Sequence, residues 1–123
     1  MIVNVLVGLV ALIHTGVLIV EICFWRQPAI HRQLAFNQEQ ADKAAPIVYN
    51  MGLYNGFLAA GLCWSFFRGE DVVAVRTFFL TCIVVAGLFG ALTLRPRTPA
   101  TLLLQTIPAA VALAAVWLVR AAV

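Results

Sequence analysis

Two ionisable side chains, His14 and Glu21, lie inside the first apolar segment of the chain. Ionisable groups at membrane depth cost free energy, so each is a candidate for proton transfer or ligand binding. Their seven-residue spacing places them on nearly the same face of a helix. The pair could bind a proton or a cation, or act as an acid and a base. Two ligands on one face do not make a metal centre, so no metal is predicted.

Amide and phenol side chains of other apolar segments lie at matching depths. A helix rises 1.5 Å per residue, which places Glu21 and Asn50 about 6 Å and Gln105 about 8 Å inside their segment ends. Tyr54 and Asn55 fall near the membrane midplane with His14. We predict that these groups line a polar cleft that opens toward the cytoplasm. The candidate ligand- or proton-binding residues are His14, Glu21, Asn50, Tyr54, Asn55 and Gln105.

Each of these polar residues also has a purely structural interpretation. Amide and imidazole groups often join membrane helices through hydrogen bonds, at about 0.6 kcal/mol each. Glu21 lies near enough to its segment end to reach water or to pair with Arg26. A carboxylate suits a ligand site better than a helix contact, whereas His14 fits both interpretations equally.

Small residues recur at helical spacing in two segments. Gly52, Gly56 and Ala60 form a stripe in the second segment, and Gly87 and Gly90 lie in the third. Small side chains allow membrane helices to approach closely. We predict that these five residues pack helices within the molecule, and a homodimer interface is the alternative for the stripe in the second segment.

Four apolar runs must position these side chains: residues 2–25, 46–67, 72–94 and 100–119. About 20 helical residues cross a hydrocarbon core roughly 30 Å thick, and each run is long enough. Hydrophobic residues make up 63% of the chain and charged residues 11%, whereas about a quarter of a soluble domain is charged. The sequence therefore predicts an all-α protein embedded in the lipid bilayer as one domain, residues 1–123.

The connections between the runs predict the topology. Residues 68–71 and 95–99 are short links, so neighbouring helices should run antiparallel in a four-transmembrane-helix bundle with both termini on the same side. Lys and Arg concentrate in cytoplasmic loops. Five of these residues fall in the first and third connections and three on the other side: Arg26, Arg32, Lys43, Arg95 and Arg97 against Arg68, Arg76 and Arg120.

This charge bias places both termini outside and residues 26–45 in the cytoplasm. It indicates a multi-pass protein of the cell membrane, of the bacterial inner-membrane type. The arginines stand at the ends of apolar runs and form no basic patch interleaved with aromatic residues, so nucleic-acid binding is not predicted.

The long connection at 26–45 contains a helix start signal. Asn37 followed three residues later by Gln40 matches a capping box. Residues 37–45 could form a separate interfacial helix, or a helix that runs on into the second segment with Pro46 as a kink. The sequence leaves both open. Near the segment ends, Trp25, Trp64 and Trp117 are expected to act as interfacial aromatic residues.

Several stretches of the chain are similar to one known family. The second segment reads NMGLYNGFLAAGL over 50–62, the third AGLFGALT over 86–93 and the fourth QTIPA over 105–109, and Trp25 follows Glu21 by four residues. Over essentially its whole length the chain resembles the domain-of-unknown-function 1304 family of small predicted membrane proteins. Met51 stands where that family's pattern has Gln, which removes one polar group from the second helix.

The resemblance implies a multi-pass membrane fold and brings no established activity. The polar positions that it implies coincide with most of the depth-matched groups: Glu21, Asn50, Tyr54, Asn55 and Gln105.

Three functions remain open from the sequence. A small transporter or ligand-binding protein ranks first, with Glu21 exchanging a proton for a substrate or cation. A structural or accessory subunit of a membrane complex ranks second, with the glycine stripe contacting a partner protein. A membrane enzyme acting on a lipid-like substrate through Glu21 and His14 ranks third, because the chain has no nucleophile elbow, zinc-helix or cofactor motif. We therefore assign no catalytic residue and no cofactor.

Overall fold

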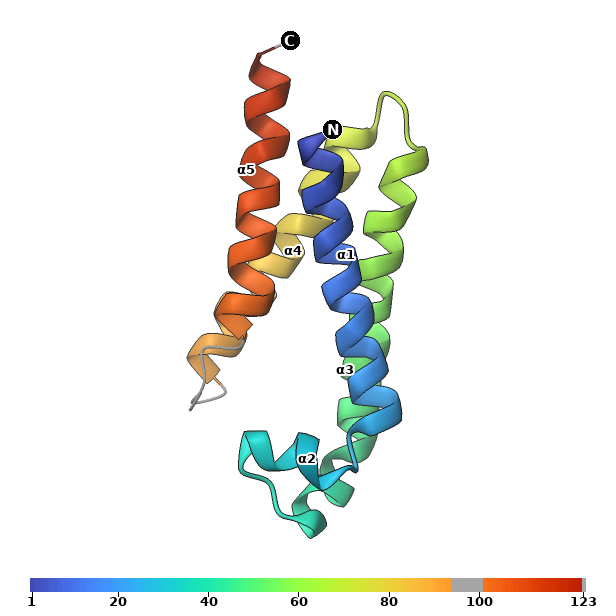
Figure 1. Ribbon diagram of the computed structural model, residues 1–123, viewed down its shortest axis with the longest axis vertical. Coiled ribbons are helices and arrows are strands. Elements are labelled where there is room, and N and C mark those ends of the chain that lie inside the picture. The colour runs from blue at the N-terminus through green and yellow to red at the C-terminus, as the bar shows by residue number, and fades with distance from the viewer. Residues whose placement is uncertain (94–100, 123) are drawn as a thin grey trace.

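The computed structural model describes residues 1–93 and 101–122, and within these ranges the secondary structure is helical without strands. The predicted link at 95–99, with the ends of the third and fourth runs at 94 and 100, lies outside the described residues. Figure 1 shows the arrangement. The elements are α1 (Ile2–Ile19), η1 (Val20–Phe24), α2 (Pro28–His31), η2 (Arg32–Leu34), α3 (Gln38–Trp64), η3 (Ser65–Phe67), α4 (Val72–Thr93), η4 (Leu102–Thr106) and α5 (Ile107–Ala121).

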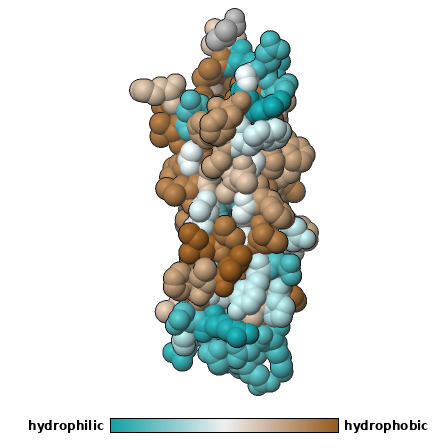
Figure 2. All heavy atoms as spheres, turned by 90° about the vertical axis from the view of Figure 1, so that its right-hand side faces the viewer, coloured by the Kyte–Doolittle hydropathy of each residue, from teal (hydrophilic) through white to brown (hydrophobic). Residues whose placement is uncertain are grey.

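Three helical stretches are long and apolar enough to cross a membrane: Ile2–Phe24, Val72–Thr93 and Leu102–Ala121. Large hydrophobic side chains are exposed along all three, as expected of surfaces that face lipid. Figure 2 shows mainly apolar residues across the middle of the face in view and hydrophilic residues toward both ends. The chain is thus an all-helical, multi-pass membrane protein. α3 is longer, at 27 residues, but starts with the polar sequence QEQADK and is not among these three.

The long helices pack in two pairs, α1 against α3 and α4 against α5, and α1 also contacts α5. The start of α1 and the end of α5, which carry the termini, lie at the same end of the molecule, and the two pairs diverge toward the opposite end (Figure 1). Where the pairs meet, one hydrophobic core is buried, and it is built from all four helices: Val7, Val10, Ala11, Leu62, Leu80, Ile83, Ala109, Ala112 and Val116. Close packing of these side chains stabilises the end of the molecule that carries the termini.

The second apolar segment begins as helix at Gln38, well before the predicted start at Pro46. The capping box is formed: Gln40 N donates to Asn37 Oδ1 and Asn37 N donates to Gln40 Oε1, both at 2.9 Å. Pro46 lies inside the helix, where it lacks the N–H that would bond the carbonyl four residues earlier. Of the two alternatives for residues 37–45, the continuous helix is therefore the one adopted.

A buried tryptophan fastens the connection at 26–45 to α3. Trp25 is buried, and its Nε1 donates a hydrogen bond to the carbonyl of Ala41 at 2.8 Å. Its ring packs edge-on against Phe36 and His31. His31 is also buried, with Nδ1 2.9 Å from the Phe36 carbonyl and Nε2 3.2 Å from Gln38 Oε1. Trp25 was expected to act as an interfacial aromatic residue, and its ring is instead covered by the connection, which folds back over it.

The link between α3 and α4 lies at the end that carries the termini. After η3, Arg68 pairs with Asp71 at 2.8 Å and stacks over the ring of Trp64, with 4.9 Å from its guanidinium carbon to the ring centroid. Trp64 and Trp117 are both exposed near helix ends, where amphipathic rings suit the membrane interface.

Candidate functional site

The carboxylate of Glu21 contacts α3 through a hydrogen bond. Asn55 Nδ2 donates to Glu21 Oε2 at 3.1 Å and lies equally close to the carbonyl of Met51, one turn earlier on α3. Glu21 is half-buried. The chain has five acidic residues, and Glu21 alone falls within the three candidate spans. A carboxylate held in this way within an apolar helix pair costs free energy, and it is therefore a candidate functional site.

This contact leaves two acceptor atoms free. In the part of the chain that the structure describes, Glu21 Oε1 and Asn55 Oδ1 have no hydrogen-bond partner, and neither is among the fully buried side-chain atoms that lack one. Both oxygens therefore keep accessible surface beside the hydrogen bond. Oxygen acceptors without competing donors can bind a proton, an ammonium group or another small cation.

Two π-helical turns carry polar residues of the predicted layer. η1 contains Glu21 and η4 contains Gln105. Such turns interrupt α-helices rarely and are frequent at functional sites. Pro108 lies just after η4 and provides no N–H to the carbonyl of Leu104. Ile107 N bonds the carbonyl of Leu102, five residues earlier. The wider turn also changes the direction of side chains relative to a regular helix.

His14 lies apart from Glu21 in a different environment. The ring is 1% exposed, in the apolar interior, and Nδ1 is 3.0 Å from the carbonyl of Val10. This hydrogen bond requires a proton on Nδ1, so Nε2 of the neutral ring is an acceptor. No hydrogen bond joins His14 to Glu21. Burial of the ring argues against its direct contact with a ligand.

Asn50 and Tyr54 face outward from α3. Asn50 is exposed, and its Nδ2 donates to the carbonyl of Pro46 at 3.0 Å. Tyr54 is 64% exposed and packs edge-on against Phe57. Consecutive helical residues point about 100° apart, so Asn55 reaches α1 while its neighbour Tyr54 does not. Equal depth along a helix therefore does not bring these side chains to Glu21.

Gln105 lies on the other helix pair. It is half-buried on η4, and no hydrogen bond joins it to Glu21 within the described ranges. Figure 1 shows η1 and η4 on diverging arms of the molecule. The layer predicted from depth is thus reduced to one contact, between Glu21 and Asn55. Beside Gln105, Thr106 is buried, and its Oγ1 has no partner in the described chain.

Two glycines of the second-segment stripe face α1. A Cβ atom on Gly52 would lie 2.9 Å from Ile22 Cγ1 and 3.1 Å from Glu21 Cβ, and one on Gly56 would lie 3.3 Å from Leu18 Cδ2. The absence of a side chain at Gly52 lets the backbones approach where Glu21 meets Asn55. The glycine is therefore part of the geometry of the candidate site.

The remaining small residues occupy different surroundings. Gly87 is buried against η4: a Cβ atom there would overlap Thr106 Oγ1 and lie 3.0 Å from Thr106 N. Ala60 is exposed and Gly90 is half-buried on α4. Close approach at Gly87 joins α4 to the π turn that carries Gln105.

Metal-ligating groups are scattered. No cluster of three His, Cys, Asp or Glu residues that could hold a metal occurs in 1–93 and 101–122.

The burial of Arg76, which is 7% exposed on α4, was not predicted from the sequence. The available signal was its position four residues inside an apolar run.

The model of the family described as "Protein of unknown function (DUF1304)" matches residues 8–117. The chain belongs to this family. The match includes both Glu21 and Asn55, and it confirms the resemblance read from the sequence. No curated protein and no solved structure matches the chain. The DUF1304 description states no activity, so the function of this member has to be argued from its site.

Proposed function

We propose that this DUF1304 protein binds a small cationic or amine-bearing molecule within the membrane at Glu21, and moves it across in exchange for a proton. The observation that carries the proposal is the hydrogen bond of 3.1 Å from Asn55 Nδ2 to Glu21 Oε2 at the α1–α3 interface. Asn55 fixes one carboxylate oxygen, which leaves the other for the ligand. The apolar surroundings favour a cation that is itself partly apolar.

Exchange follows from competition for one carboxylate. A proton and a cation each neutralise the charge of Glu21, so binding of one disfavours binding of the other. A shared site that is accessible alternately from each side would couple their movements in opposite directions. Cation affinity should therefore rise with pH until Glu21 is fully ionised. His14 should not contribute to this dependence, because its ring lies in the apolar core.

The proposal includes a membrane arrangement in which α3 is the fourth crossing. The termini would lie outside and residues 26–45 in the cytoplasm of a bacterial-type cell, as the Lys and Arg distribution favours. Single cysteines at Gln33 and Ala122, in a variant without native cysteines, test this with a membrane-impermeant maleimide on intact cells. Labelling at 122 and protection at 33 is expected, and labelling of both or neither excludes the arrangement.

Cation binding can be measured with the full chain in lipid nanodiscs and tetraphenylphosphonium as the probe. Glu21→Gln should abolish calorimetric binding, and Asn55→Ala should weaken it. Asn50→Ala is the matched control, because Asn50 also donates to the carbonyl four residues earlier but does not reach Glu21. Equal affinity of the wild type and Glu21→Gln would refute the proposed site.

Transport requires a separate readout. In proteoliposomes loaded with tetraphenylphosphonium, an inward proton gradient should accelerate release of the cation, and Glu21→Gln should remove this acceleration. Binding without gradient-driven release would restrict the function to ligand binding.

A second candidate function is supported by the outward face of α3. Asn50 and Tyr54 are exposed polar side chains, and polar groups within a membrane are stabilised by contact with another helix. This favours a subunit that contacts a partner protein or a second copy through α3. A photoreactive amino acid at position 54 should then form a specific cross-link, whereas one at the exposed Leu12 on α1 should not. Lipid adducts alone at both positions would exclude the contact.

A further inference from the structure

Arg76 places a positive charge in the interior of the molecule near the end that carries the termini. It lies four residues inside α4, which corresponds to about 6 Å, and is 7% exposed. Its Nε donates to Ser65 Oγ at 3.2 Å, and its guanidinium carbon lies 5.1 Å from the centroid of the Phe66 ring. Among residues 1–93 and 101–122, no carboxylate forms an ion pair with it.

A hydroxyl group and an aromatic face do not neutralise a guanidinium. Arg presents five N–H donors, and one of them is engaged here, by Ser65. Buried charges are generally paired with an opposite charge, because desolvation is otherwise uncompensated. The other donors of Arg76 are not among the fully buried atoms that lack a partner, so they remain accessible to an anion from outside the described chain.

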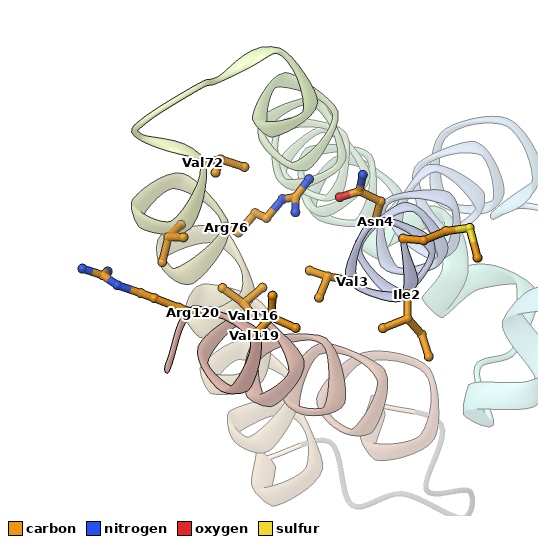
Figure 3. Close-up of a pocket in the computed structure, with 10 residues that line it drawn as sticks. Ile2, Val3, Asn4, Val72, Arg76, Val116, Val119 and Arg120 are labelled. Carbon is orange, nitrogen blue, oxygen red and sulfur yellow. The ribbon is translucent and has the colours of Figure 1, made fainter. Parts of the chain in front are cut away.

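A pocket of about 450 Å³ adjoins Arg76. Figure 3 shows the Arg76 guanidinium extending toward Asn4, whose carboxamide faces it, while Arg120 extends outward from the pocket. Arg120 lies over the ring of Trp117, with 5.1 Å from its guanidinium carbon to the centroid. The other walls come from α1, α4, α5 and Met1, and they are apolar: Met1, Ile2, Val3, Val72, Val73, Val116 and Val119.

We propose that this pocket binds the phosphate group of an anionic lipid, with Arg76 as the anchoring residue. A planar guanidinium can donate bidentate hydrogen bonds to two oxygens of one phosphate group. The apolar walls favour a phosphate attached to an acyl-bearing molecule over a free anion. Arg76 also lies at the depth expected for contact with the headgroup region. The site is separate from Glu21 and stands independently of the function proposed for that residue.

Native mass spectrometry of the full chain in detergent tests the proposal with three probes. Phosphatidylglycerol should be retained, phosphatidylcholine of the same acyl chains should be retained at least about tenfold more weakly, and inorganic phosphate should neither bind nor displace phosphatidylglycerol. Equal retention of the two lipids would overturn the proposal. Displacement by inorganic phosphate would assign the pocket to a free anion and would also overturn it.

Variants identify the anchoring residue. Arg76→Lys keeps the positive charge but loses the two-pronged donor, and should weaken retention of phosphatidylglycerol about tenfold. Arg68→Gln is the control, because this arginine lies at the same end of the molecule but pairs with Asp71. Unchanged retention in Arg76→Lys, or an equal loss of retention in Arg68→Gln, would refute the assignment.

A pair of variants on α5 tests the pocket without altering Arg76. Val119 and Val111 are equally exposed, but only Val119 lines the pocket. Val119→Trp should fill the space and reduce retention of phosphatidylglycerol, while Val111→Trp should leave it unchanged. Equal effects of the two variants would contradict binding in this pocket.

Discussion

The hydrogen bond between Asn55 and Glu21 makes a quantitative prediction for stability. Asn55→Ala removes two contacts, one to the Met51 carbonyl and one to Glu21, and Asn50→Ala removes only the equivalent backbone contact to Pro46. Hydrogen bonds between membrane helices contribute about 0.6 kcal/mol on average and at most about 1.7. Because the acceptor is a half-buried carboxylate, we expect a value in the upper half of this range.

A double-mutant cycle isolates this value. Unfolding free energies are measured in mixed micelles by circular dichroism for the wild type, Asn55→Ala, Glu21→Ala and the double variant. The coupling between Asn55 and Glu21 should be about 1–1.7 kcal/mol. The parallel cycle of Asn50→Ala with Glu21→Ala should give a coupling near zero. Equal couplings in the two cycles would refute the specific contact.

Other packing features make simpler predictions. Gly87→Ala should lower the free energy of unfolding by about 1–3 kcal/mol through overpacking against η4. Gly16→Ala should be neutral or stabilising in thermal unfolding, because no atom lies within 4 Å of the added Cβ. Equal effects of the two variants would contradict the close packing at Gly87. Trp25→Phe should lose the hydrogen bond to Ala41 and accelerate proteolysis within residues 27–37, and unchanged cleavage would show that this bond does not hold the connection. Asn37→Ala should reduce stability by about 1 kcal/mol through loss of the cap, and an unchanged unfolding midpoint would contradict this role.

That the protein is a membrane protein can be predicted directly from the sequence, because this depends only on the length and summed hydropathy of each run of residues. The length and apolar character of a run suffice to predict a helix near Ile2–Phe24, Val72–Thr93 and Leu102–Ala121. The capping box at Asn37 likewise predicted a helix start, since it involves only local hydrogen bonds. These features require no knowledge of how the helices are arranged.

The candidate site was harder to predict because it depends on helix rotation and on the separation between helices. The similar depth of Asn50, Tyr54 and Glu21 along their helices suggested that these side chains meet. Their angular positions around the α3 axis differ, however, and among the candidate residues of α3 only Asn55 reaches Glu21 on the first helix. Depth also grouped Gln105 with Glu21, although the two helix pairs diverge at this end (Figure 1). The burial of Trp25 depends on the fold of residues 26–45, which a run of hydropathy values does not encode.

Reaction with dicyclohexylcarbodiimide tests the central role of Glu21 most directly, because this apolar reagent modifies carboxyl groups within the hydrocarbon region. The four other acidic residues, Glu39, Asp42, Glu70 and Asp71, are exposed and lie outside the candidate spans. Mass spectrometry of the protein in nanodiscs should show one adduct, on Glu21, whose formation is slowed by tetraphenylphosphonium. An unmodified Glu21, or labelling that the cation does not affect, would contradict a cation- and proton-binding carboxylate at this position.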